Sequence, residues 1–220
     1  MSRITAFAVV FGVLAQSLTT SHLANEASVS EIALPQTFVS HDVAGNVTLR
    51  AHIVVEGLDV DGQLDEPIYQ DIEPVANFIQ QEPNEGAAAT ERTEAWVLYD
   101  VENLYVSVRL WDSAPEQMVA NELRRDNRNI TQNESFAVVL DTFHDRRNGF
   151  FFQTNALGAL RDGLITDERN ANFDWNTVWD VQTGSFENGW TIEMVIPFKS
   201  LRFREKGGQV WGINLHRFVR

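Results

Sequence analysis

Six tryptophans are the residues of this 220-residue chain with the most distinctive chemistry. Aromatic rings stack on the apolar C–H faces of sugar rings, and neighbouring amides, carboxylates and arginines then bond the hydroxyl groups. Trp175 lies in the polar run 170–177, which is typical of a loop, and Trp179 follows at the start of an expected strand. We predict that one of these two rings is exposed to a ligand.

The other four tryptophans divide into two classes. Trp96 shares its expected strand face with an acid and Trp111 ends a strand, so both could face solvent and contact a ligand. Trp190 and Trp211 lie in strong strand patterns and are expected in the core. Ligand contacts commonly lie on loops, and a polar, glycine-containing loop follows the central strands. The polar candidates for ligand binding are Arg124, Arg125, Asn155 and Asp162.

One polar turn offers a candidate metal site. Asp141, Asp145 and Asn148 are spaced so that their oxygens could coordinate calcium. The alternative is a hairpin loop whose acids pair with Arg146 and Arg147. The five histidines are scattered without the spacing of a zinc site. Calcium is therefore the one cofactor that the residues themselves suggest.

The candidates surround two expected strands, 135–141 and 150–155, which we interpret as a central hairpin. In both segments the side chains alternate with a period of two and include aromatic and β-branched residues, as β-strands do. Asn148 and Gly149 are expected to supply the positive φ angles of the reversal.

Further strands are expected at short intervals. A single helical turn is predicted after Pro67, and a short helical or irregular crossing at 197–203. Many short strands separated by turn residues are typical of a two-layer antiparallel β-sandwich, jelly-roll or immunoglobulin-like. The other expected strands are 52–55, 78–82, 94–99, 104–111, 164–167, 177–183, 189–197 and 209–219.

The first 24 residues have the order of a secretory signal peptide: Arg3, an apolar run over 4–15, and a small residue at Ala24. The apolar run is too short to span a bilayer comfortably as a helix, and an uncleaved anchor is the alternative. Residues 25–49 are polar and weakly patterned, which predicts a linker with at most one short strand. We expect an exported protein that is periplasmic, secreted or associated with the outer membrane, and whose domain occupies 50–220.

The charge of the chain limits its partners. The formal net charge is −14, and removing residues 1–24 would remove one arginine and no acid, giving −15. So acidic a domain repels polyanions, which excludes nucleic acid, whereas calcium or a neutral ligand suits it. Because the chain has no cysteine, its core must hold it together without disulfides.

Several short motifs follow one another along roughly residues 50–220. They are Asp61–Tyr69, Thr90–Thr93, Leu98–Asp100, Leu104–Tyr105, Arg124–Asp126, Asp141–Asp145, Asn155–Gly158, Trp175 with Trp179, Gly189–Trp190, Ile196–Phe198 and Leu201–Phe203.

Together these motifs resemble the family 9 carbohydrate-binding module. The resemblance implies a β-sandwich that binds an oligo- or polysaccharide without cleaving it, sometimes with structural calcium. Such modules stand at the front of long bacterial outer-membrane proteins, so a membrane β-barrel beyond the C-terminus is an implied partner. No sugar-clamping residue of the family can be aligned here.

Three alternatives to simple sugar binding stay open. Glycoside hydrolysis needs two carboxylates across a cleft, and nothing in the sequence pairs two of the candidates Glu134, Asp162 and Glu193. If the chain has any activity, the family's association with carbohydrate catabolism favours hydrolysis of O-glycosyl compounds. Related sandwiches can hold haem, for which Met118 and Met194 are potential axial ligands. A docking domain without sugar binding would instead present a broad apolar patch.

Overall fold

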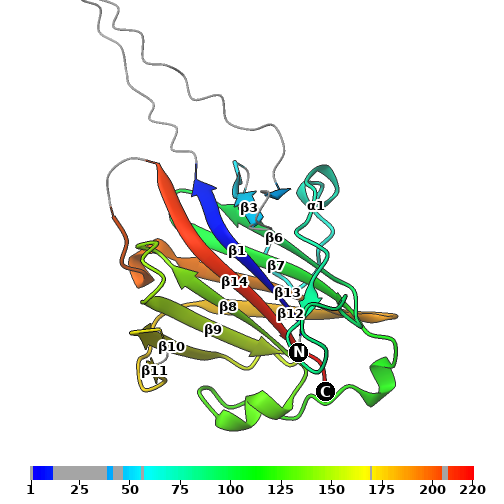
Figure 1. Ribbon diagram of the computed structural model, residues 1–220. Coiled ribbons are helices and arrows are strands. Elements are labelled where there is room, and N and C mark those ends of the chain that lie inside the picture. The colour runs from blue at the N-terminus through cyan, green and yellow to red at the C-terminus, as the bar shows by residue number, and fades with distance from the viewer. Residues whose placement is uncertain (1, 12–38, 42–46, 56, 169, 205–207) are drawn as a thin grey trace, which may run out of the picture.

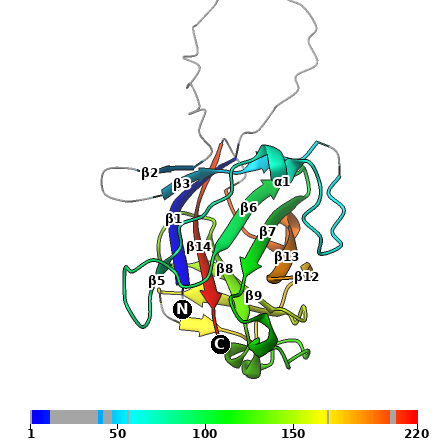
Figure 2. The same cartoon turned by 90° about the vertical axis from the view of Figure 1, so that its right-hand side faces the viewer.

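The computed structural model describes residues 2–11, 39–41, 47–55, 57–168, 170–204 and 208–220. Its strands form two sheets that pack face to face (Figures 1 and 2), which confirms the predicted β-sandwich. In the described part of the chain, helix is limited to one α-turn and three 3-10 turns, none of which is long and apolar enough to cross a membrane. They are α1 (Ile68–Asp71), η1 (Pro115–Gln117), η2 (Arg128–Gln132) and η3 (Phe198–Ser200).

The larger sheet, sheet A, has nine strands in the order β11-β10-β9-β8-β14-β1-β3-β2, with β5 paired to β1. Its neighbours run antiparallel except β1 and β3, which are parallel. The bounds are β1 (Ser2–Phe11), β2 (Val39–His41), β3 (Val47–Arg50), β5 (Ile79–Gln80), β8 (Ser135–Asp141), β9 (Gly149–Asn155), β10 (Arg161–Thr166), β11 (Asn170–Asn172) and β14 (Gln209–Phe218).

The smaller sheet, sheet B, has five strands in the order β12-β13-β7-β6-β4. Only β4 runs parallel to its neighbour. The bounds are β4 (His52–Ile53), β6 (Thr93–Tyr99), β7 (Asn103–Trp111), β12 (Asp180–Phe186) and β13 (Gly189–Pro197). These strands begin and end within a few residues of the predicted ones, because the alternating pattern marks them clearly.

The core between the sheets is built from alternate residues of the long strands. From β7 the side chains of Leu104, Val106, Val108 and Leu110 point inward and are fully buried. Trp190 of β13 and Trp211 of β14 are each 1% exposed, as the sequence predicts for core residues. Burial of such rings contributes roughly 2–3 kcal/mol each, so this layer holds the sandwich together without disulfides.

A second apolar layer covers the outer face of sheet B. The segment 57–72, which carries α1, lays Leu64, Tyr69 and Ile72 over Trp96 and its neighbours on β6 and β7. Buried Glu193 of β13 fastens this segment, since its carboxylate accepts hydrogen bonds from the Gly62 amide at 2.8 Å and the Tyr69 hydroxyl at 2.8 Å. The outer face of sheet B is therefore partly closed by this segment.

The residues expected to form a signal peptide include a strand of sheet A. Strand β1 pairs antiparallel with β14 and parallel with β3. Residues 12–38 and 42–46, which hold the rest of the expected signal peptide and most of the expected linker, lie outside the described residues. Strands β2 and β3 place two short strands in the range where at most one was predicted. Cleavage of a signal peptide stays a prediction.

The central hairpin of β8 and β9 is confirmed, but its turn differs from the prediction. Positive φ angles occur at His144 (53°) and Arg146 (59°) and not at Asn148 or Gly149. Gly149 is instead the first residue of β9, where a Cβ atom would lie 3.1 Å from the Leu140 carbonyl oxygen. A close approach of two strands, and not the turn, therefore favours glycine there.

Candidate functional site

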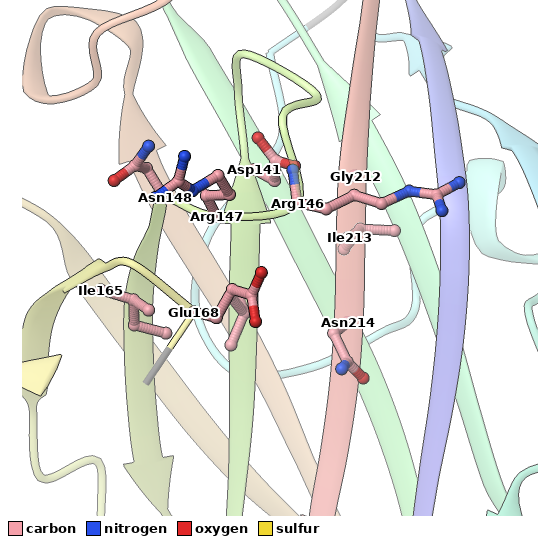
Figure 3. A pocket seen from close by; sticks show the side chains of 10 residues that line it. Asp141, Arg146, Arg147, Asn148, Ile165, Glu168, Gly212, Ile213 and Asn214 are labelled. Atoms are coloured by element: carbon pink, nitrogen blue, oxygen red, sulfur yellow. The ribbon is translucent and has the colours of Figure 1, made fainter. Parts of the chain in front are cut away.

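A groove with a volume of about 340 Å³ lies on the outer face of sheet A, beside the loop that joins β8 to β9 (Figure 3). Apolar side chains of the strands form its floor, and charged and amide side chains stand around it. The lining residues are Val139, Asp141, Arg146, Arg147, Asn148, Ile165, Glu168, Gly212, Ile213 and Asn214.

Two glycines in the sheet account for the hollow. Gly212 of β14 lies opposite Asp141, and Gly149 of β9 lies opposite Ile165. Because neither glycine carries a side chain, the surface of this end of the sheet is lower on both sides of the β8–β9 hairpin. A Cβ atom on Gly212 would lie 3.1 Å from the Cβ of Asp141 and would stand in the groove.

The loop at the rim is held by its own acids. The Asp141 carboxylate accepts hydrogen bonds from the backbone N–H groups of Asp145 (3.1 Å) and Arg146 (2.6 Å). The Asp145 carboxylate accepts from the backbone of Arg147 (2.8 Å) and from the backbone (2.9 Å) and side chain (2.8 Å) of Asn148. These hydrogen bonds hold the pKa of Asp145 below its usual value. The acids therefore fix the backbone that carries Arg146 and Arg147.

This arrangement bears on the predicted calcium site. The oxygens of Asp141 and Asp145 already accept N–H bonds from the loop, and the described residues contain no group of three or more acids or histidines placed to hold a metal ion. Calcium binding by Asp141, Asp145 and Asn148 stays a prediction. The alternative predicts that these acids form ion pairs with the side chains of Arg146 and Arg147. The structure instead shows the acids accepting hydrogen bonds from the backbone N–H groups of these arginines.

A second loop closes the far side of the groove. Arg147 donates from Nη2 to Asp167 Oδ1 at 2.7 Å, and the Glu168 amide donates to the Arg147 carbonyl at 2.7 Å. The exposed ion pair contributes at most about 1 kcal/mol, so the backbone bond is the firmer link. It brings Glu168 to the rim, across the groove from Arg146 (Figure 3).

The groove therefore combines an apolar floor with donors and acceptors of several kinds. Val139 and Ile165 offer apolar surface, while Arg146 provides a guanidinium and Glu168 a carboxylate. Asn148 and Asn214 add amide groups that can donate and accept. Such a set fits a ligand that has apolar faces and many hydroxyl groups.

The two tryptophans proposed as stacking residues do not line this groove. Trp179 is only 4% exposed, its ring packs edge-on against Phe152, and its Nε1 donates to Asp162 Oδ1 at 3.1 Å. Trp179 is therefore not the exposed ring of the predicted pair, and ligand contact by Trp175 stays a prediction. Trp175 is half-buried and packs against Phe150, with the ring centroids 5.4 Å apart.

Trp96 and Trp111 also differ from the expected exposed rings. Trp96 is 3% exposed because the segment 57–72 covers it, and its Nε1 donates to the Ile72 carbonyl at 3.0 Å. The prediction that it faces solvent is wrong, since the strand pattern cannot reveal a third layer. Trp111 is half-buried, and the Arg92 guanidinium lies 4.1 Å from the centre of its ring.

Arg125 and Asp162 are brought together, but to brace a loop. Arg125 Nη2 lies 2.5 Å from Asp162 Oδ1 and also donates to the Thr177 carbonyl at 2.9 Å. Asp162 is fully buried and accepts from the Thr177 amide at 2.8 Å as well as from Trp179. This network fixes the loop that leads from sheet A to sheet B.

Asn155 and Arg124 serve the neighbouring loop. Asn155 is fully buried, and its Nδ2 donates to the Glu122 carbonyl at 2.7 Å and to Asn133 Oδ1 at 3.0 Å. Exposed Arg124 pairs with the Glu122 carboxylate at 3.0 Å. Of the residues predicted for ligand or metal, only Asp141 and Asn148 line the groove.

Sequence reasoning missed Glu168 and Asn214 as rim residues and assigned Arg146 and Arg147 only to pairing. A signal for Asn214 was present, because the last strand alternates Gly212, Asn214 and His216 with buried apolar residues. Glu168 had no such signal, since its position depends on a backbone bond to a distant loop.

Comparisons with known proteins place this fold. The profile of a family described as "Carbohydrate family 9 binding domain-like" matches residues 60–218. A family 9 carbohydrate-binding module from Caldicellulosiruptor kristjanssonii in complex with glucose is 16% identical, with a TM-score of 0.52 over 76% of this chain and 77% of that one. Its complex with cellotriose gives 16% identity and a TM-score of 0.50, over 76% and 75% of the two chains.

A third similar structure is a putative carbohydrate-binding protein from Bacteroides uniformis. It is 11% identical, with a TM-score of 0.54 over 76% of this chain and 81% of that one. No curated protein matches the chain. At these low sequence identities the similar structures support the fold alone, whereas the match to the family profile shows the family.

Proposed function

The chain belongs to the carbohydrate family 9 binding domain-like family, and from this premise we propose that it binds an oligo- or polysaccharide in the groove on sheet A. The observation that carries the proposal is the polar rim around an apolar floor. Val139 and Ile165 would contact the C–H faces of sugar rings, and Arg146, Glu168 and Asn214 would bond hydroxyl groups.

We propose binding without cleavage, because the acids considered for catalysis are engaged elsewhere. Asp162 is buried against Arg125, and Glu193 is buried under the segment 57–72 on the opposite sheet. Glu134 is fully buried and accepts a hydrogen bond from the Arg220 amide at 2.8 Å. The groove itself is lined by the carboxylates of Asp141 and Glu168, and Asp141 is committed to the loop.

The test is calorimetry against a panel of neutral oligosaccharides that includes glucose and cellotriose. Arg146→Ala and Glu168→Ala should each weaken binding, by roughly three- to tenfold for the loss of a hydrogen bond or two. Arg124→Ala is the matched control, because Arg124 is exposed and lies outside the groove.

Two results would count against the proposal. If none of the sugars binds, carbohydrate binding itself is overturned. If Trp175→Ala abolishes binding while Arg146→Ala and Glu168→Ala leave it intact, the site lies at the loop that carries Trp175 and the groove assignment fails.

We also propose that the chain is exported and serves carbohydrate catabolism at the outer membrane. The signal-like order of residues 1–24 supports export, and the family resemblance supports the rest. N-terminal sequencing of the protein recovered from its native compartment tests the first part, and a start at Met1 would refute cleavage. Reading the coding DNA past Arg220 tests the link to a membrane protein.

A further inference from the structure

Arg161 is a buried arginine that makes no ion pair with an acid in the part of the chain that the structure describes. It begins β10 and is 7% exposed. Its Nη1 donates to the neutral side chain of Gln153 at 3.2 Å, and its Nε is buried with no hydrogen-bond partner. Such a guanidinium is unfavourable, because burial and the charge of Arg128 lower its pKa, and Asp126 opposes this only from beyond ion-pair distance.

Arg217 shows how this protein compensates a structural arginine. It is fully buried, and its guanidinium donates to the Trp111 carbonyl at 2.6 Å, the Arg92 carbonyl at 3.0 Å and Thr93 Oγ1 at 3.1 Å. Its Nε also lacks a hydrogen-bond partner, but it faces the buried Glu134 carboxylate at 3.9 Å. Arg161 has no such carbonyl acceptors and no acid within ion-pair distance, since Asp126 acts on it only from farther away.

The surroundings of Arg161 hold its guanidinium in one orientation. Gln153, which accepts from Arg161, itself donates to Ser135 Oγ at 3.1 Å. The ring of Phe173 lies 3.7 Å from the Arg161 Cζ. Stacking covers the flat face of a guanidinium and leaves its in-plane N–H groups for an acceptor.

This site lies on the same sheet face as the groove. Arg161 and Ile165, which lines the groove, are four residues apart on β10, so their side chains share a face and are about 13 Å apart along the strand. Between them Phe173 covers Gly163, where a Cβ atom would lie 2.7 Å from the Phe173 ring. A ligand that extends from the groove along β10 therefore meets a half-buried aromatic ring and then Arg161.

We infer that Arg161 binds a carboxylate of an acidic sugar whose neighbouring units occupy the groove, an inference that rests on the proposed function. A guanidinium edge matches a carboxylate with two parallel N–H···O bonds. The net charge of −14 repels long polyanions, so the expected ligand carries few carboxylates among neutral units.

The experiment compares an acid with its neutral methyl ester. The probe is cellotriose oxidised to a carboxylate at its terminal C6, titrated beside its methyl ester. The acid should bind at least about tenfold more tightly than its ester. Arg161→Gln should remove this preference and leave the affinity for the ester unchanged, and Arg161→Lys should restore only part of it. Arg124→Gln, at an exposed arginine that pairs with Glu122, is the matched control and should keep the preference.

The Arg161 Nε–Hε resonance, assigned by its absence in Arg161→Lys, gives a second readout and should shift with the acid but not with the ester. If an acid and its ester bind equally, the inference is overturned while the proposed function stands. If no acid, ester or neutral sugar binds, both fall. If sodium acetate shifts the resonance at the same concentration as the acidic sugar, the site takes any carboxylate and the assignment to a sugar is overturned. Should Arg161→Gln fail to fold by circular dichroism, Arg161→Lys and the resonance decide the question.

Discussion

Replacing Glu193 by glutamine should stabilise the domain at alkaline pH and leave its fold unchanged. Glu193 is fully buried on the outer face of sheet B, and burial raises its carboxyl pKa from 4.5 to about 7. Its carboxylate accepts from the Asp61 amide at 3.0 Å, the Gly62 amide at 2.8 Å and the Tyr69 hydroxyl at 2.8 Å. A glutamine oxygen can accept from the same amides, while its NH₂ group donates to the Tyr69 oxygen and the Tyr69 hydroxyl donates to Ser107.

The sign and the size of the effect follow from the difference between the two pKa values. Because the folded protein raises the pKa of Glu193, the stabilising contribution of its protonated form is complete below pH 4.5 and is lost as the pH rises through 7. One pKa unit corresponds to about 1.4 kcal/mol, so the loss between pH 5.5 and pH 8.5 is about 2 kcal/mol. Glutamine does not titrate, so the variant should avoid this loss.

Urea unfolding followed by tryptophan fluorescence measures the effect, with both proteins compared at each pH. The free energy of unfolding of Glu193→Gln minus that of the unsubstituted protein should rise by about 2 kcal/mol between pH 5.5 and pH 8.5. Glu187→Gln, at an exposed acid before the same strand, is the matched control and should show no such rise. A flat difference for Glu193→Gln across this range would refute the reasoning about the buried carboxyl group.

Three further outcomes are expected. Gly189→Ala should lower the free energy of unfolding in urea by about 2–3 kcal/mol or more, because its Cβ would lie 2.0 Å from the Leu110 carbonyl oxygen. Gly57→Ala is the control and should change the free energy of unfolding little, since Gly57 has open space around it. Equal effects of the two substitutions would contradict the close approach of Gly189 to Leu110. Asp162→Ala should lower the free energy of unfolding by about 2–3 kcal/mol, because the Thr177 amide and Trp179 Nε1 lose their buried acceptor. Asp167→Ala, which breaks an exposed pair, should lower it by at most about 1 kcal/mol, and equal losses would contradict the role of the buried acceptor. Millimolar calcium tests the predicted site of the β8–β9 loop: a rise of the thermal midpoint that Asp145→Asn removes would establish it, and an unchanged midpoint would contradict it.

Much of the fold could be predicted from the sequence because strands with one buried face repeat every second residue. The alternating pattern predicted the observed bounds of β8 and β13, and it predicted that Trp190 and Trp211 lie in the core. It failed for Trp96, where an acid on the same strand face suggested solvent. The segment 57–72 covers that face, and a layer contributed by a distant part of the chain leaves no trace in the period of a strand.

The site was harder to predict for a related reason. Tryptophans and asparagines in polar segments suggested ligand contacts, but Trp179 and Asn155 are buried where their N–H groups tie loops to the sheet. A run of polar residues in the sequence does not show whether a side-chain amide is available to a ligand or is hydrogen-bonded to a backbone carbonyl. The groove depends on the pairing of Gly212 with Asp141 and of Gly149 with Ile165 on neighbouring strands. These pairs follow from the register of the sheet, which the sequence alone does not reveal.

The position of β14 in the middle of sheet A has a consequence for the order in which the protein can fold. β14 joins β8 to β1, although the chain passes through both strands β12 and β13 of the other sheet between β8 and β14. The inner row of Leu215, Ile213 and Trp211 is therefore missing from the core until β14 has been synthesised. Contacts between such distant segments make folding slow, and sandwiches of this kind fold in milliseconds to seconds. The core can thus be completed only after β14 has been synthesised, and β8 and β1 stay without their common partner until then.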